Sequence, residues 1–324
     1  MYIIDITKIE VGDIFLTRSN SRISQLVRQL TKSEFSHAVL YVGVSSCIES
    51  DGPGVQSQNL QRLIFESPSD ITILRIKNEK NRISDAIVFA RQKIGTEYSL
   101  EEAKLALLEK QKKANEPNRQ FCTRFVAQAY QSAGVNIVEN PDYCTPEDLI
   151  NSEFLVEIKE ALRKATEAEI KFAKSESPLE KQQKIHNEIF KEARKISNTD
   201  IQTFEQLSKY VLENPEKEPQ ITKIIKDSGY LSMWKMDTDN NPWHYDHKLL
   251  IEHYQNPKQI IDVALFFATT EKETRSRFEI TLDTLKFGYS FFGQEYFKIL
   301  IELYEKLIEL SLKREITALK ILKG

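Results

Sequence analysis

The chain has 324 residues, of which 40% are hydrophobic and 29% charged, and its formal net charge is -3. This length can hold two domains with separate cores. The weakly acidic balance provides no clustered basic face of the kind that grips nucleic acid, so we expect no nucleic-acid partner. The three cysteines show no metal-ligand or disulfide spacing, which is usual in a reducing compartment. We therefore expect no metal and no cofactor.

Targeting and membrane segments are not recognisable in the sequence. The N-terminus reaches Asp5 before any sustained apolar run, which is not the pattern of a signal peptide. The longest apolar runs, 38–42 and 263–268, are far shorter than the roughly 18 residues of a membrane span. We expect a cytoplasmic protein without an integral membrane segment. Export by another route would leave no trace in these patterns.

The glycines divide the chain into two parts. Six glycines fall before residue 152, and none occurs between Gly134 and Gly229. Frequent turns are therefore expected in the first part. The second part is rich in Lys, Glu, Ile, Leu and Ala at helical spacing. We predict an α+β domain over 1–152 and an all-helical domain over 153–324.

Short strands alternate with helices in the first part. We predict strands at 14–17, 36–43, 46–49, 55–57 and 71–76. Helices are predicted at 20–30, 84–93, 100–113 and 122–134, and a last helical turn opens at Pro146. Val44-Ser45 would join two strands into a hairpin, and Ser84 is expected to cap its helix.

Helical patterns fill the second part. They cover 154–174, 178–197, 200–213, 219–227, 246–254, 257–268, 271–287 and 293–322. His244 and His247 are three residues apart, but no H-E-x-x-H pattern is present, so no metal site is predicted there. His186 and His253 have no cysteine near them in this part. We expect this domain to bind a protein partner or to target the protein, and to supply no catalytic group.

Cys122 is the first candidate for chemistry. It begins an apolar helix face that continues through Phe125, Val126 and Ala129. Free N–H groups and the positive dipole end at a helix N-terminus favour a thiolate, which is a nucleophile. The simpler explanation is a small buried hydrophobe that extends the face. Cys47 and Cys144 lie near no base in the sequence and are interpreted as structural.

A base and an orienting group for this thiol are available in the first part. His37 opens an otherwise apolar strand, where its side chain can face a cleft. In a hairpin through Val44-Ser45, Glu49 would approach His37 and hold its ring, with Asp51 as the rival carboxylate. Cysteine catalysis requires such a base and such an orienting group. A satisfied edge histidine and a surface carboxylate explain the same residues without catalysis.

Five short motifs follow one another in an order that resembles a known family. They are Gly12-Asp13-Ile14, Ser36-His37-Ala38-Val39-Leu40-Tyr41-Val42-Gly43, Ile48-Glu49-Ser50, Gly95-Thr96-Glu97-Tyr98 and Phe121-Cys122-Thr123-Arg124-Phe125-Val126. The order resembles the circularly permuted papain-like hydrolases of the NlpC-type superfamily, YiiX-like group, over residues of about 10–150. The lecithin:retinol acyltransferase-like group is similar at a greater distance. In the permuted families the histidine strand precedes the cysteine helix, as it does here.

The resemblance implies a permuted papain-like domain, with a small antiparallel sheet and helices, and a catalytic triad. Cys122 would be the nucleophile, His37 the base and Glu49 the orienting residue, and Tyr98 would line the substrate site. The implied activity is hydrolysis of an amide or ester through a thioester acyl-enzyme, on a peptide, a cell-wall peptide or a lipid. An acyltransferase and a catalytically silent binding module are the alternatives. Two features depart from the family pattern: Ser99 replaces an acidic residue, and Thr123-Arg124 replaces Ser-Glu.

Overall fold

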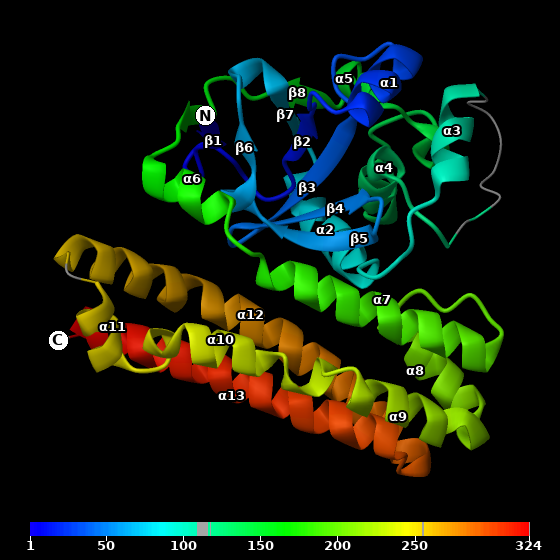
Figure 1. The fold of residues 1–324 in the computed structure, drawn as a ribbon, viewed down its shortest axis with the longest axis vertical. Coiled ribbons are helices and arrows are strands. Elements are labelled where there is room, and N and C mark those ends of the chain that lie inside the picture. The colour runs from blue at the N-terminus through cyan, green and yellow to red at the C-terminus, as the bar shows by residue number, and fades with distance from the viewer. Residues whose placement is uncertain (109–115, 117, 255, 324) are drawn as a thin grey trace. The chain divides into compact units, whose positions relative to one another are not determined.

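The computed structural model of the protein describes residues 1–108, 116, 118–254 and 256–323. It divides into two compact units, Met1–Gln183 and Lys184–Gly324. The first unit contains the sheets, and the described part of the second unit is built from helices (Figure 1). The predicted combination of an α+β domain with a helical domain is therefore confirmed.

A six-stranded antiparallel sheet forms the centre of the first unit. Its strand order is β5-β4-β3-β2-β7-β8. The strands are β2 (Ile14–Thr17), β3 (His37–Gly43), β4 (Ser46–Asp51), β5 (Gly54–Asn59), β7 (Ile71–Ile76) and β8 (Leu155–Glu157). All neighbours in this order pair antiparallel. Five of these six strands lie where the apolar runs predict them.

The two faces of this sheet enter different cores because side chains alternate along each strand. On one face, Ile14, Leu40 and Ile48 join Phe125 and Val126 in a buried cluster. The last two belong to α4 (Cys122–Ser132), which packs on this face together with α2 (Ile83–Gln92). On the other face, Phe15, Val39 and Tyr41 form a second cluster. The sheet is thus covered on both sides, and α4 is anchored along its length.

A second, three-stranded sheet has the order β6-β1-β9. It consists of β1 (Tyr2–Ile4), β6 (Ile64–Phe65) and β9 (Leu162–Lys164). The predicted helix over 154–174 is therefore wrong in its first part, where β8 and β9 lie, and only α6 (Glu167–Ala173) is helical there. Since β8 pairs with β7 and β9 with β1, the compact first unit extends to Gln183, beyond the boundary predicted near Ser152.

The remaining helices of the first unit are α1 (Arg22–Thr31), α3 (Leu100–Leu108) and α5 (Pro146–Ile150). Thr145 caps α5 through a capping box with Asp148. The predicted cap at Ser84 is wrong, because α2 already begins at Ile83 after Arg82, whose side chain makes no capping bond. The predicted extension of the helix after residue 108 lies outside the described residues.

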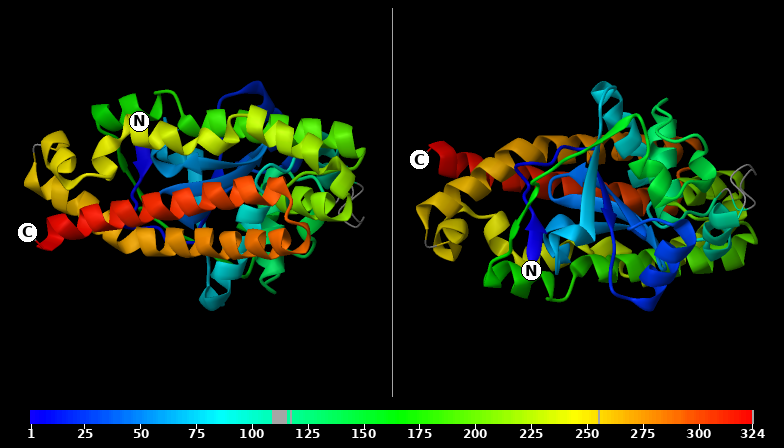
Figure 2. Two further views of the ribbon diagram at one scale, coloured as in Figure 1. Left: turned by 90° about the horizontal axis from the view of Figure 1, so that it is seen from below. Right: turned by 90° about the horizontal axis from the view of Figure 1, so that it is seen from above.

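The helices of the second unit are mostly those that the sequence predicts. They are α7 (Pro178–Ser197, which begins in the first unit), α8 (Phe204–Glu213), α9 (Glu218–Asp227), α10 (Trp234–Asn240), α11 (His247–His253), α12 (Pro257–Phe292) and α13 (Glu295–Lys323). The two helices predicted at 257–268 and 271–287 form the single helix α12. Gly293, at φ 60°, ends α12, and α13 runs back alongside it (Figure 2). No helix among the described residues is long and apolar enough to cross a membrane.

Candidate active site

Cys122 is the first residue of α4 and is 8% exposed. Phe121 before it is extended, and no side chain caps the helix. The first N–H groups of the helix and the positive end of its dipole are therefore available beside the thiol. Phe125, Val126 and Ala129, on the predicted apolar face, are fully buried and anchor the helix in the core. The thiol is thus held at the end of a rigid element.

His37 and Glu49 come together through the predicted hairpin. The turn between β3 and β4 is made by Val44 and Ser45, both with positive φ (52° and 55°), as the tight turns of hairpins require. The register pairs Val39 with Glu49. Because His37 lies two residues before Val39, it shares a sheet face with Glu49 as a diagonal neighbour. His37 Nε2 and Glu49 Oε2 are 2.8 Å apart.

The Cys122 thiol also acts on the His37 ring, because it is one of the groups that raise the pKa of His37. Glu49 occupies Nε2 of the ring. Burial opposes the charged ring, but the hydrogen bonds and negative charges of Cys122 and Glu49 outweigh it and raise the pKa of His37 well above its ordinary value. These contacts therefore favour the protonated form of the ring. The His37 side chain is 25% exposed, so it is open to solvent on one side.

Asp51, the rival carboxylate, lies at the end of β4 and bonds elsewhere. Its Oδ1 accepts a hydrogen bond from Gln56 Nε2 at 3.0 Å. Burial first, and then the negative charge of Glu49, raise the pKa of Asp51 to about 6, while the charge of His37 acts in the opposite direction. Of the two carboxylates, Glu49 is the one bonded to the imidazole.

Tyr98 reaches this region from the segment between α2 and α3. It forms an isolated parallel bridge with Gln120, and the N–H of Ser99 donates to the Gln120 carbonyl at 2.8 Å. Burial raises the pKa of Tyr98 above its ordinary value, and the negative charges of Cys122 and Asp51 raise it further. The phenol therefore lies within electrostatic reach of the thiol. The structure thus brings together all four residues that the sequence singles out.

A buried ion pair next to the thiol was not predicted. Arg124 Nη2 and Glu102 Oε2 are 2.5 Å apart, and their side chains are 0% and 1% exposed. The Arg124 guanidinium also donates to the carbonyl of Asp142 at 2.8 Å and to that of Arg119 at 3.3 Å. It lies 4.8 Å from the centre of the Phe121 ring. One side chain thus holds the loop that precedes Cys122 and a loop that follows α4.

Glu102 completes this network. Its N–H donates to Ser99 Oγ at 3.0 Å, and its Oε1 accepts from the N–H of Glu116 at 2.7 Å. Burial favours the neutral acid, but hydrogen bonds from Tyr143, Arg124 and the Glu116 main chain outweigh it and lower the pKa of Glu102. Glu102 is therefore charged. The spacing Ser99-x-x-Glu102 signals a helix start in the sequence, but it does not reveal the partner Arg124.

The other cysteines and histidines are placed differently. Cys47 and Cys144 are 0% and 2% exposed, and burial raises the pKa of both thiols, in agreement with their structural interpretation. In the second unit, His244 Nδ1 lies 3.3 Å from Asp237 Oδ1, and His253 stacks on Trp243. Within the ranges that the structure describes, no three His, Cys, Asp or Glu side chains converge as metal ligands.

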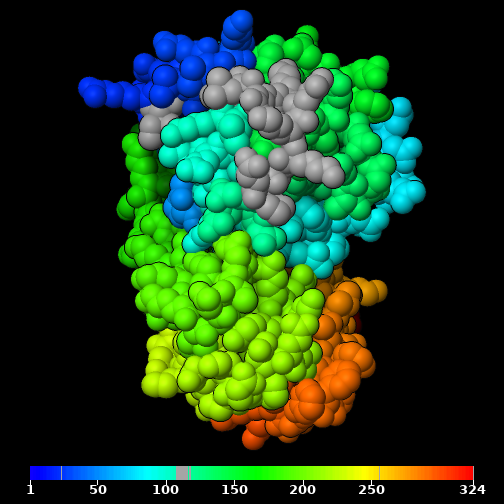
Figure 3. Space-filling model, turned by 90° about the vertical axis from the view of Figure 1, so that its right-hand side faces the viewer, coloured from blue at the N-terminus to red at the C-terminus, as the bar shows by residue number. Residues whose placement is uncertain are grey.

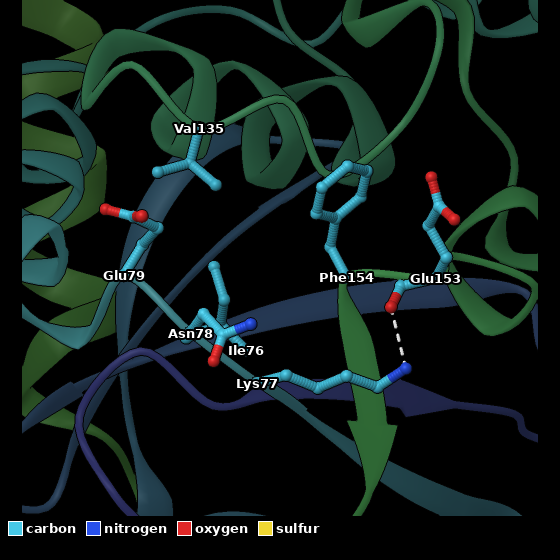
Figure 4. Close-up of a pocket in the computed structure, with 7 residues that line it drawn as sticks. All are labelled: Ile76, Lys77, Asn78, Glu79, Val135, Glu153 and Phe154. Atoms are coloured by element: carbon cyan, nitrogen blue, oxygen red, sulfur yellow. Dashed lines mark hydrogen bonds between the residues drawn. The ribbon is translucent and has the colours of Figure 1, made fainter.

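A hollow of about 330 Å³ lies elsewhere in the first unit (Figure 4). It is lined by Ile76, Lys77, Asn78, Glu79, Val135, Glu153 and Phe154. Lys77 Nζ donates to the Glu153 carbonyl at 2.6 Å across it. Val135 follows the C-terminal end of α4, whereas Cys122 begins that helix. The hollow contains none of the predicted site residues.

Comparisons with known proteins find a matching family model and a similar solved structure. Residues 8–149 match the sequence model of the permuted papain-like amidase enzymes of the YaeF/YiiX type, the C92 family. Among solved structures, the chain is similar to the metalloprotein yiiX from Escherichia coli O157:H7, with 17% identity and a TM-score of 0.38, over 47% of this chain and 97% of that one. A search of curated proteins found no match. An amidase family is a family of hydrolases. The similarity to the YaeF/YiiX group of permuted papain-like amidases therefore covers residues 8–149 of the chain.

Proposed function

We propose that the first unit is a cysteine amidase in which Cys122 is the nucleophile, His37 the general acid and base, and Glu49 the orienting carboxylate. One observation carries the proposal: His37 Nε2 lies 2.8 Å from Glu49 Oε2, and Cys122 and Glu49 both act on the His37 ring to raise its pKa. The raised pKa of His37 supports a protonated ring that can give a proton to a leaving group. The amidase family whose model matches residues 8–149 supports an amide as the substrate.

The first half of the reaction forms a thioester. The Cys122 sulfur attacks the carbonyl carbon of the amide, and the carbonyl oxygen becomes an oxyanion. The main-chain N–H of Cys122, at the uncapped start of α4, is suited to stabilise that oxyanion. As the C–N bond breaks, the protonated ring of His37 gives its proton to the departing amine. Cys122 is left acylated and His37 neutral.

The second half releases the acyl group. Neutral His37 takes a proton from a water molecule, which attacks the thioester carbonyl. The C–S bond then breaks, the acid departs, and the thiolate and imidazolium are restored. Glu49 holds the ring at Nε2 throughout and stabilises its positive charge. Tyr98, whose phenol lies near the thiol, is proposed to line the acyl or amine side of the cleft.

Acylation by an activated ester, p-nitrophenyl acetate, tests the proposal without knowledge of the natural substrate. Intact-mass spectrometry should show one acetyl group on the wild-type chain, and peptide mapping should place it on Cys122. Cys122→Ala should abolish the adduct, whereas Cys47→Ala and Cys144→Ala should keep it. His37→Ala should slow acylation by about 10²–10⁴-fold, and Glu49→Gln should slow it less. Circular dichroism checks that each variant is folded.

The same assay separates the alternatives. Acylation that is unchanged in Cys122→Ala would refute the nucleophile. A wild-type chain that takes no acetyl group, although its Cys122 reacts with iodoacetamide, would favour a silent binding module. Transfer of the acetyl group to an added amine faster than to water would favour an acyltransferase. Peptide, cell-wall peptide and lipid amides are the substrate classes to compare once acylation is established.

A further inference from the structure

Helix α1 turns leucine side chains toward solvent. Leu26 is 56% exposed and Leu30 is 53% exposed, and they lie one turn apart on the same side of the helix. A polar side of α1 faces the protein instead: Ser24 is buried, and its Oγ lies 2.7 Å from Ser36 Oγ. Surface helices usually bury their apolar side. The exposed leucines therefore suggest that α1 has a partner outside the first unit.

The chain segment that contains these leucines carries only positive charges. Between Asp13 and Glu34 the chain has no acidic residue and four basic ones, at positions 18, 22, 28 and 32, although the whole chain has a net charge of -3. Arg18 is neutralised, because it pairs with Asp70 at 3.4 Å and lies 3.7 Å from Glu34. Arg28 lies one turn after Ser24, on the side of α1 that faces the protein, and its Nε is buried. Arg22 and Lys32 have no acidic partner within the described residues. Two uncompensated cations thus accompany the leucines.

This surface adjoins the candidate active site. Ser36, which is bonded to Ser24 of α1, is the neighbour of His37 in the chain. Leu100, two residues after Tyr98, begins α3 and is 61% exposed. Exposed leucines therefore lie close in sequence to two residues of the site: Leu26 and Leu30 come before His37, and Leu100 comes after Tyr98. Helix α1 lies at the periphery of its unit, where a flat partner can reach it (Figures 1 and 3).

We propose that α1 docks the protein on an anionic lipid bilayer. Leu26 and Leu30 would enter the boundary between headgroups and acyl chains, and Arg22 and Lys32 would contact lipid phosphates, as interfacial amphipathic helices do. An acidic protein is the less suitable partner. Two leucines on a convex helix provide too little apolar area for the core of a protein interface, which buries on the order of 1,000 Å² or more in total.

Docking of α1 has one consequence that rests on the proposed function: the Cys122 site would act on amides presented at a membrane surface. Docking itself requires no catalysis. The full chain with Cys122→Ala can therefore be tested on sedimenting vesicles of phosphatidylcholine, with and without phosphatidylglycerol. We expect binding that depends on phosphatidylglycerol and that falls as salt is raised. Hydrolysis of soluble p-nitrophenyl acetate by the active chain should not change when α1 is altered.

Two α1 variants and one matched control decide the question. Leu26→Ser with Leu30→Ser, and separately Arg22→Gln with Lys32→Gln, should each weaken vesicle binding by about tenfold. Leu312→Ser with Leu319→Ser removes two leucines of α13 that are 44% and 38% exposed, and it should leave binding unchanged. Thermal unfolding checks that each variant folds.

Three outcomes would overturn the proposal. They are absence of binding to phosphatidylglycerol vesicles, loss of binding in the α13 control alone, and full binding by the Leu26/Leu30 variant. The last result would mean that α1 is a cationic patch for an acidic macromolecule. None of these outcomes affects acylation of Cys122, so failure here is distinct from failure of the proposed function.

Discussion

Arg124 and Glu102 form an ion pair of 2.5 Å that is almost completely removed from solvent. Arg124 lies on α4, two residues after Cys122. A buried pair of this kind seldom stabilises a fold more than well-packed apolar residues would. Arg124 does more than neutralise a charge, because it also donates to the carbonyls of Asp142 and Arg119. We therefore infer that Arg124 is a positioning residue for the start of α4.

Replacing the pair separates positioning from stability. Arg124→Met alone leaves Glu102 charged and buried without a partner, and it should cost about 3–5 kcal/mol of unfolding free energy. The double variant Glu102→Leu, Arg124→Met should recover most of that stability in urea unfolding. It should still acylate more slowly with p-nitrophenyl acetate, because the loop carbonyls have lost their donor. Wild-type acylation by a stable double variant would show that the pair has a structural role only.

The three cysteines should differ in reactivity. Iodoacetamide near neutral pH should modify Cys122 well before Cys47 or Cys144, because thiolate is the reactive form and burial raises the pKa of the latter two thiols. Peptide mapping after brief treatment measures the order. His37→Ala should slow the labelling of Cys122, and the labelling of the two buried thiols should stay as slow as in the wild type. Labelling of Cys144 first would contradict the assignment of the nucleophile.

The sequence predicts the central features of the site because they depend on local patterns. The apolar period places Cys122 at a helix start, and the hairpin at Val44 and Ser45 fixes the diagonal between His37 and Glu49. Local patterns also leave a choice, since Asp51 has the same chemistry as Glu49 only two residues away. Strand register and the contact with His37 decide between them, and both are properties of the folded sheet.

Features that depend on distant contacts were missed. Strands β1, β6, β8 and β9 have two or three residues each, which is too short for an alternating pattern, and they form because distant strands pair with them. Arg124 on a helix face resembles an ordinary charged residue until Glu102, 22 positions earlier, meets it in the core. Such pairs are visible only in three dimensions.

Asp51 should make the first unit less stable at neutral pH than in weak acid. Its pKa is about 6 in the folded protein against an ordinary value of 3.8, so folding takes up a proton between these values. The stability gained in this way is fully present below pH 3.8 and is lost as pH rises through about 6. Asp51→Asn should therefore unfold at a higher temperature than the wild type near pH 7.5, and at the same temperature near pH 4.

All three cysteines lie in the first unit, so labelling of the buried Cys47 and Cys144 during heating reports its unfolding. The wild type serves as its own reference at the two pH values. An Asn variant that is equally stable, or less stable, at pH 7.5 would mean that the Asp51 carboxylate is better solvated than its surroundings indicate.

His186 should set the acid stability of the second unit. Its side chain is buried against Phe204 and Tyr230, at ring-centre distances of 5.4 and 5.5 Å, and its Nε2 has no hydrogen-bond partner among the described residues. Burial lowers the pKa of His186 from 6.5 to about 4. The unfolded chain therefore binds a proton that the folded chain excludes. The resulting stability is present above pH 6.5, and about 3 kcal/mol of it is lost as pH falls through about 4.

His186→Leu tests this directly, because leucine fills the aromatic pocket without a titratable nitrogen. Both tryptophans of the chain, Trp234 and Trp243, lie in the second unit, so their fluorescence follows the unfolding of that unit in urea. The wild type should lose stability between pH 6.5 and pH 4, and the leucine variant should lose markedly less over the same interval. His247→Leu, at a half-buried position in the same unit, is the matched control, and its stability should change with pH as that of the wild type does. Parallel pH curves for the wild type and His186→Leu would show that acid acts on this unit through other groups.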